Sequence, residues 1–281
     1  MSMKELKSID VTSFTVISTG IVTLFALIFA ILLGVAILVT VPNSFSAVVF
    51  ITTTIVFGTM VSSVFLYFSE GYLYNVLSKR IKCISLDIDE SGYIKKISPT
   101  GTALITGAIA FLMLVILYFA FALILPLLLN SFISILMYAG QYILAYMLYQ
   151  YIFILSSPMV ILIGIIVTAI VVSLVTLISA YIYNLLASSE RGIIVGLSKE
   201  DKYFVLEKIE YKNFAIAIAT IILVLNLIMG IFQVVTGSPV FTTLVGIFIR
   251  FFATLIAALI LAACYNFLAP RIGELRFELE N

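Results

Sequence analysis

Long apolar runs alternate with short charged stretches along this chain. Six of the runs reach the roughly 20 residues that a helix needs to cross the hydrocarbon core of a bilayer. They cover residues 11–41, 45–68, 102–129, 158–186, 213–235 and 240–268. Only the last of them contains a charged residue, Arg250. The pattern therefore predicts an all-α membrane protein with six transmembrane helices.

The charged stretches all fall at the same end of these predicted helices. They cover residues 4–10, 70–96, 190–212 and 271–280, whereas the turns at 40–46, 130–158 and 235–239 contain no charged residue. Positively charged loops stay on the cytoplasmic side of a membrane. We therefore expect a multi-pass protein of the cell membrane with both termini in the cytoplasm.

Residues 131–155 complicate the count of spans, because they are mostly apolar and carry no charge. Their polar and tyrosine side chains recur every three or four residues, which is the spacing of one helix face. Tyrosine also favours the boundary between membrane and water. We predict an extra helix that lies in the outer interface, and a seventh span is the alternative.

A Tyr-Asn pair ends the second helix of each predicted hairpin, and a small residue, a basic residue and a β-like run follow it. Self-similarity of this kind indicates tandem copies. We predict three hairpin modules, at 4–89, 93–201 and 203–281, which share one orientation. Such modules form a bundle with pseudo-threefold symmetry about the membrane normal. The three pairs are Tyr74-Asn75, Tyr183-Asn184 and Tyr265-Asn266.

Alternating apolar and polar residues predict short strands beside the helices. Four of these strands form two hairpins, whereas the first and the last have no neighbour in the sequence and are expected to pair with each other. The result is a small cytoplasmic β layer, and irregular charged loops are the alternative. The predicted strands cover residues 4–9, 84–88, 93–97, 193–197, 203–209 and 275–279.

The ends of the modules carry a resemblance to a known family. The first module opens with Leu-Lys-Ser-Ile-Asp at 6–10, and the third closes with Tyr-Asn-Phe-Leu-Ala at 265–269. This resembles a family of small two-span bacterial transmembrane proteins of unknown function, which close with Tyr-Asn-x-x-Ala, a Gly-Gly pair and a strand. The chain departs from that pattern, since Gly192 and Gly273 stand alone and the first module has neither glycine. The resemblance implies that single-copy relatives oligomerise, and it implies no chemistry.

Arg250 is the one ionisable residue inside a predicted span, and such residues are candidate functional sites. It lies sixteen residues before Asn266, and the same offset from the other two asparagines gives Thr59 and Thr168. In a pseudo-threefold bundle these three residues would converge near the axis, with Asn226 as a further partner.

Small residues at helical spacing surround Arg250 on its helix, and seams of this kind let membrane helices pack closely. We therefore expect Arg250 to face protein or a cavity. Three roles stay open: a structural arginine, a site for an anionic lipid or small anion, and part of a transport pathway. The seam consists of Thr243, Gly246, Ala253, Ala257 and Cys264.

The repeated Tyr-Asn pairs are interpreted as structural. An asparagine amide can bind the carbonyls that a helix C-terminus leaves unpaired, and the adjacent tyrosine can anchor at the interface. The alternative is a cytoplasmic ligand site built from the three asparagines.

The composition excludes several classes of function. The chain has no histidine to act as a catalytic base and no Gly-rich phosphate loop. Its net charge of only +1 argues against nucleic-acid binding. We expect no enzyme activity, no cofactor and no metal. The favoured hypothesis is a non-enzymatic scaffold or interaction module that contacts membrane lipids and a cytoplasmic protein partner. The alternative is a transporter or channel with an axial polar site around Arg250.

Overall fold

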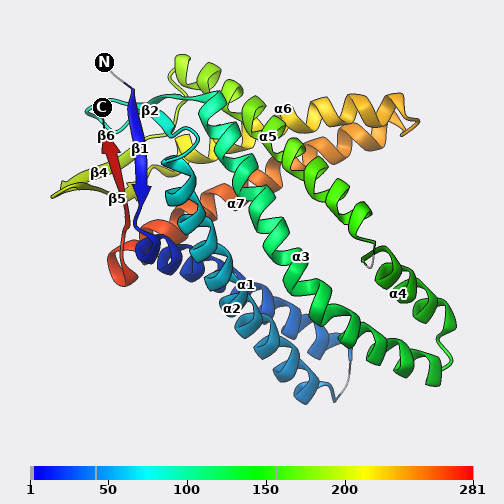
Figure 1. Cartoon of the computed structure of the whole chain (residues 1–281). Coiled ribbons are helices and arrows are strands. Elements are labelled where there is room, and N and C mark those ends of the chain that lie inside the picture. Colours follow the sequence, from blue (N-terminus) through cyan, green and yellow to red (C-terminus); the bar gives the residue numbers. More distant parts are fainter. Residues whose placement is uncertain (1–2, 42, 156, 281) are drawn as a thin grey trace.

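The computed structural model describes residues 3–41, 43–155 and 157–280, without the side chains of 120–127 and 155. The described chain is mostly helical, with the strands gathered at one end and the helices extending away from them (Figure 1). The helices are α1 (Val11–Thr40), α2 (Phe45–Ser78), α3 (Pro99–Tyr138), α4 (Tyr142–Leu155), α5 (Pro158–Ser188), α6 (Tyr211–Val235) and α7 (Val240–Ile272).

Six helices of the described chain are long and apolar enough to cross a membrane. They are α1, α2, the Pro99–Phe119 part of α3, α5, α6 and α7. This agrees with the six spans predicted from the apolar runs and is the composition of a multi-pass membrane protein.

Local chemistry sets where several of these helices begin. The Asp10 carboxylate accepts a hydrogen bond from the Ser13 backbone N–H at 2.6 Å, which is the usual contact of an N-cap residue. Pro99 and Pro158 occupy the first position of α3 and α5, where a missing N–H costs nothing. The helices therefore start where the polar segments meet the apolar runs.

The prediction of one interfacial helix over residues 131–155 is wrong. The structure continues α3 to Tyr138, turns at Gly140 with a φ of +73°, and begins α4 at Tyr142. Glycine adopts this left-handed conformation without steric cost, so the chain can fold back there. The 14 residues of α4 fall short of the roughly 20 that a separate span needs.

Six antiparallel strands form one sheet, in the order β3-β2-β1-β6-β5-β4. The predicted small β layer is therefore present, and the first and last strands pair as expected, with Leu6 opposite Leu279. The strands are β1 (Lys4–Ile9), β2 (Ile84–Ile88), β3 (Ile94–Ile97), β4 (Val195–Glu200), β5 (Tyr203–Ile209) and β6 (Leu275–Glu280).

The two outer strands of this order also meet each other. Tyr93 and Ile194 form an antiparallel bridge, the Ile94 N–H donates to the Ile193 carbonyl at 2.9 Å, and the Val195 N–H donates to the Gly92 carbonyl at 3.0 Å. This bridge closes the six strands into a ring. The bridge lies only at the first residues of β3 and β4, whereas closure along the whole length of the strands would remove both edges.

The helices pack in three pairs, α1 with α2, α3 with α5, and α6 with α7. Figure 1 shows these pairs diverging as they leave the sheet. Buried clusters join neighbouring pairs on the sheet side of the helices, and each cluster includes one of the repeated tyrosines. The core clusters are Ile17, Ile21, Cys264, Tyr265 and Ala269; Tyr74, Leu77, Ile105 and Ile109; and Tyr183, Ala187, Ala217 and Ile221.

Candidate functional site

The three repeated asparagines make the same pair of hydrogen bonds. Each amide oxygen accepts the N–H, and each amide nitrogen donates to the C=O, of the isoleucine that lies two residues before the first helix of the same pair. All six bonds measure 2.8–2.9 Å. The partners are Asn75 with Ile9, Asn184 with Ile97, and Asn266 with Ile209.

The neighbouring tyrosines are buried and bind the same strands. The hydroxyl of Tyr74 donates to the Leu6 carbonyl at 2.5 Å, and that of Tyr183 donates to the Ile94 carbonyl at 2.6 Å. Tyr265 makes the equivalent bond to the Leu206 carbonyl. The asparagines thus bind strand backbone, rather than the helix carbonyls that the sequence suggested, and their amides are engaged within the protein.

A third set of bonds links each helix pair to another one. The residue just before the first helix of each pair donates its backbone N–H to a backbone carbonyl of a different pair, at 2.8–3.0 Å. In every case this carbonyl lies ten residues after the repeated asparagine of that other pair. The bonds run from Asp10 to Arg276, from Ser98 to Ser85 and from Glu210 to Ile194. Together they pass once around the sheet.

Arg250 lies on an exposed surface of α7 and donates from Nη1 to the Asn226 side-chain oxygen at 3.3 Å. Asn226 in turn donates to the Ile222 carbonyl at 2.9 Å. Thr168 lies on a separate surface, a hollow between α3 and α5 that Tyr118 also lines. In the described chain, Arg250 and Thr168 therefore share no pocket.

The middle of the seam of small residues around Arg250 is not packed against a neighbouring helix, whereas its two ends, Thr243 and Cys264, are buried. A Cβ added to Gly246 would meet nothing within 4 Å, and Ala253 and Ala257 are exposed. The close contact between α6 and α7 lies at Gly230, where an added Cβ would come within 2.7 Å of Ile247 and 3.2 Å of the seam residue Thr243. The expectation that small residues mark the packed face holds at the ends of the seam and fails beside Arg250, where Ala253 and Ala257 are exposed.

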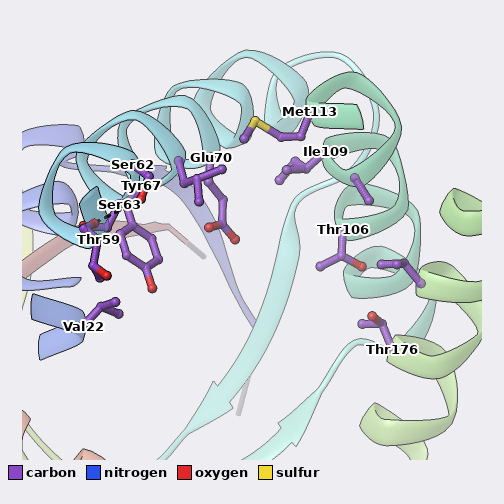
Figure 2. A pocket seen from close by; sticks show the side chains of 13 residues that line it. Val22, Thr59, Ser62, Ser63, Tyr67, Glu70, Thr106, Ile109, Met113 and Thr176 are labelled. Carbon is purple, nitrogen blue, oxygen red and sulfur yellow. Dashed lines mark hydrogen bonds between the residues drawn. The ribbon is translucent and has the colours of Figure 1, made fainter. Parts of the chain in front are cut away.

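Thr59 lines a cavity of about 550 Å³ between the α1/α2 and α3/α5 pairs. Figure 2 shows Glu70, Tyr67, Ser63 and Thr59 on the α2 wall, facing Thr106 and Thr176 on the opposite wall. Apolar residues complete the lining: Val22, Leu66, Ile109, Ala110, Met113 and Val172. The size is that of the roughly 300–1,000 Å³ pockets that hold small molecules.

Glu70 is a residue of this cavity that the sequence did not single out as a candidate. It was assigned to the charged stretch 70–96, but α2 continues to Ser78 and includes it. A signal was available, because the Tyr74-Asn75 pair marks the end of a helix and Glu70 precedes that pair by one helical turn. The helix α2 therefore carries a carboxylate just beyond the predicted span 45–68.

Neither cysteine belongs to a redox or metal site in the described part of the chain. Cys83 and Cys264 are both free and buried, and no group of three His, Cys, Asp or Glu side chains there is arranged to hold a metal ion. Burial raises the pKa of the Cys83 thiol, whose sulfur lies 3.4 Å from the Ser78 carbonyl. Cys83 is therefore a poor nucleophile at neutral pH.

The fold and site define a multi-pass helical membrane protein in which three helix pairs are hydrogen-bonded to one six-stranded sheet. Comparison of the chain with protein-family models, curated proteins and solved structures gives no match. Any functional conclusion therefore depends on the geometry alone.

Proposed function

We propose that this chain is a non-enzymatic membrane scaffold made of three tandem hairpin modules, 4–89, 93–201 and 203–281, with pseudo-threefold symmetry. One observation carries the proposal. The bonds from Asp10, Ser98 and Glu210 end at the same offset, ten residues after Asn266, Asn75 and Asn184, respectively. Equal offsets at all three junctions support a repeated unit that closes on itself.

The closed sheet also favours a scaffold over a transporter. Alternating access in many transporters requires one repeat to rock against another around a fixed site. Here every helix pair is bonded to the ring through a buried tyrosine and a doubly bonded asparagine. Rocking at the sheet end would break several of these bonds at once, so the ring acts as a rigid base.

The outer surface of the ring is the face that we assign to a cytoplasmic protein partner. The strands of the ring expose both signs of charge, on Lys95, Lys96, Glu207, Lys208 and Arg276. Mixed charge suits a water-soluble protein better than a polyanion. The concentration of basic residues at this end supports its cytoplasmic location, and with it the cytoplasmic location of both termini.

Photo-crosslinking in intact cells tests the scaffold. A benzophenone amino acid at Lys96 or Lys208, on the ring, is expected to capture one recurrent protein. The same probe at Ser46, at the opposite end of α2, serves as the control and is expected not to capture it. Identical adducts from all three positions, or lipid adducts alone, would refute a protein-binding role of the ring.

The transport alternative is tested at Arg250. The scaffold proposal predicts that Arg250→Leu leaves folding and the crosslink from Lys96 unchanged, because Arg250 bonds only Asn226 among the described residues. If the folded variant instead loses a solute flux that the unaltered protein shows in proteoliposomes, the scaffold proposal fails.

A further inference from the structure

The cavity between the first two helix pairs contains a carboxylate without a counter-ion. Glu70 is the only acidic residue in the helices as the structure describes them. The ion pairs found in the described chain are Lys7 with Glu5, Lys95 with Asp89, and Arg276 with Glu200, and none of them involves Glu70. Ionisable groups on helices that can cross a membrane are candidate functional sites. Glu70 is exposed and lines this cavity, so its carboxylate is open to a cationic ligand.

Arg250 is too far along the bundle to be the counter-ion of Glu70. Glu70 lies five residues before Asn75, whereas Arg250 lies sixteen residues before Asn266. Since the two asparagines make the same contact with the sheet, the eleven-residue difference corresponds to about 16 Å along the helix axes. Arg250 also belongs to the α6/α7 pair, which contributes no residue to the lining of this cavity.

Three hydroxyl groups in the cavity lining, those of Ser62, Ser63 and Thr106, offer acceptors rather than donors. Ser62 donates its O–H to the Gly58 carbonyl at 2.6 Å, Ser63 to Met60 at 3.0 Å and Thr106 to Thr102 at 2.8 Å. A hydroxyl has a single proton, so each of these oxygens is left with lone pairs only. Together with the carboxylate they present acceptors to a cationic donor, and the negative charge of Glu70 disfavours an anion. The hydroxyls of Thr59, Tyr67 and Thr176 can donate as well as accept.

The remainder of the lining fits the apolar body of such a cation. The polar wall from Thr59 to Glu70 spans eleven residues of α2, or about 16 Å. Val22, Ile109 and Met113 lie along the same cavity, and the ring of Tyr67 packs edge-on against Phe14 at 5.8 Å. An aromatic ring beside a carboxylate is a favourable neighbour for an ammonium group.

We propose that this cavity binds an amphiphilic ammonium compound, with its cationic head at Glu70 and its apolar body along Val22, Ile109 and Met113. The proposal goes beyond the scaffold role and does not depend on it. The ammonium can be supplied by a free lipophilic amine or by the amine head group of a membrane lipid, and both present the same chemistry to Glu70.

The test is thermal unfolding of the full chain in a neutral sugar detergent with n-octylammonium as the probe. The chain has no tryptophan, but its two buried free cysteines allow a thiol-reactive dye to report unfolding. n-Octanol has the same apolar body without the charge and is the matched control ligand. We expect octylammonium to raise the Tm more than octanol does.

Glu70→Gln is expected to weaken octylammonium binding about tenfold or more, because it removes a charge-assisted hydrogen bond. Glu207→Gln removes one acid from the exposed sheet and is expected to bind as the unaltered protein does. Thr106→Val removes one acceptor from the opposite wall while keeping the side-chain shape, and should weaken binding even if Glu70→Gln does not fold. Equal binding by the unaltered protein and these cavity variants, or equal shifts with octanol, would overturn the proposal.

Nanodiscs separate the two sources of the ammonium. If phosphatidylethanolamine discs suppress the octylammonium response and phosphatidylglycerol discs do not, the occupant is a lipid amine. If both kinds of disc leave the response intact, the site takes a free amine.

Discussion

At the scale of single residues, Asn75, Asn184 and Asn266 each satisfy one backbone donor and one backbone acceptor with a single side chain. A buried backbone group without a partner costs free energy comparable to a lost hydrogen bond. An amide has both a donor and an acceptor on one rigid plane, so it can close both bonds at once. Alanine at these positions would leave both backbone groups open.

Replacing any one of the three asparagines by alanine is expected to lower the free energy of unfolding in detergent by about 1–3 kcal/mol. The effect should be similar at all three positions, because the three contacts are the same. Asn130→Ala is the control, since Asn130 is an exposed residue of α3 and alanine is the better helix former. A loss at only one of the repeated positions would contradict their equivalence.

The repeat identified these asparagines in the sequence, but the partners could not be read from it. The pattern suggested helix carbonyls close by in the chain, whereas the bonds reach residues 57–87 positions away. Glu70 was not singled out for a related reason. A charged residue near the end of an apolar run can belong to the helix or to the loop, and only the course of α2 decides between them.

At the scale of elements, the closure between β3 and β4 depends on how closely two backbones approach. Gly92 has a φ of +80°, and a Cβ placed there would lie 1.8 Å from the Val195 carbonyl oxygen. That carbonyl belongs to backbone and cannot swing aside as a side chain can. The bridge at Tyr93 and Ile194 therefore requires a glycine at position 92.

Gly92→Ala is expected to open the ring between β3 and β4 and to destabilise the protein. Gly237→Ala is a matched control, because Gly237 also has a positive φ, of +106°, but an added Cβ would meet nothing within 4 Å. In the Gly237→Ala control, only the unfavourable φ lowers the free energy of unfolding, by about 1–2 kcal/mol. In Gly92→Ala, the clash with the Val195 carbonyl should lower the free energy of unfolding by a further amount of about 1–3 kcal/mol.

Amide hydrogen exchange at Ile94 and Val195 measures the opening directly, because both N–H groups donate across the bridge. Both should lose protection in Gly92→Ala and keep it in Gly237→Ala. Retained protection in Gly92→Ala would show that the closure does not need the glycine.

At the scale of the whole molecule, the ring fastens the three helix pairs at one end and leaves them apart at the other (Figure 1). The buried clusters lie where the pairs still meet, and much of the surface farther out is large apolar side chains. A bilayer would cover that surface. The orientation then follows from the basic residues around the ring.

Cysteine labelling with a membrane-impermeant maleimide tests this orientation. In a background that lacks Cys83 and Cys264, we expect Ser46→Cys and Thr236→Cys to react in intact cells. Ser91→Cys, in the β2–β3 turn, should react only after the membrane is opened. Reaction of Ser91→Cys in intact cells would place the ring on the outer side and would exclude a cytoplasmic partner.

The sequence by itself determined the six spans and the side of each hairpin on which charge collects, because a helix that crosses lipid must be apolar along its whole length. It also determined the Tyr-Asn repeat and the short strands, since both are local signals. The pairing of β1 with β6 followed by elimination, because these two strands have no neighbour in the sequence to pair with. Only the tertiary structure decided that the sheet closes, that α3 continues past the predicted break, and that Thr59 and Arg250 lie on different surfaces. These features depend on contacts between residues far apart in the chain, and such contacts leave no period in the sequence.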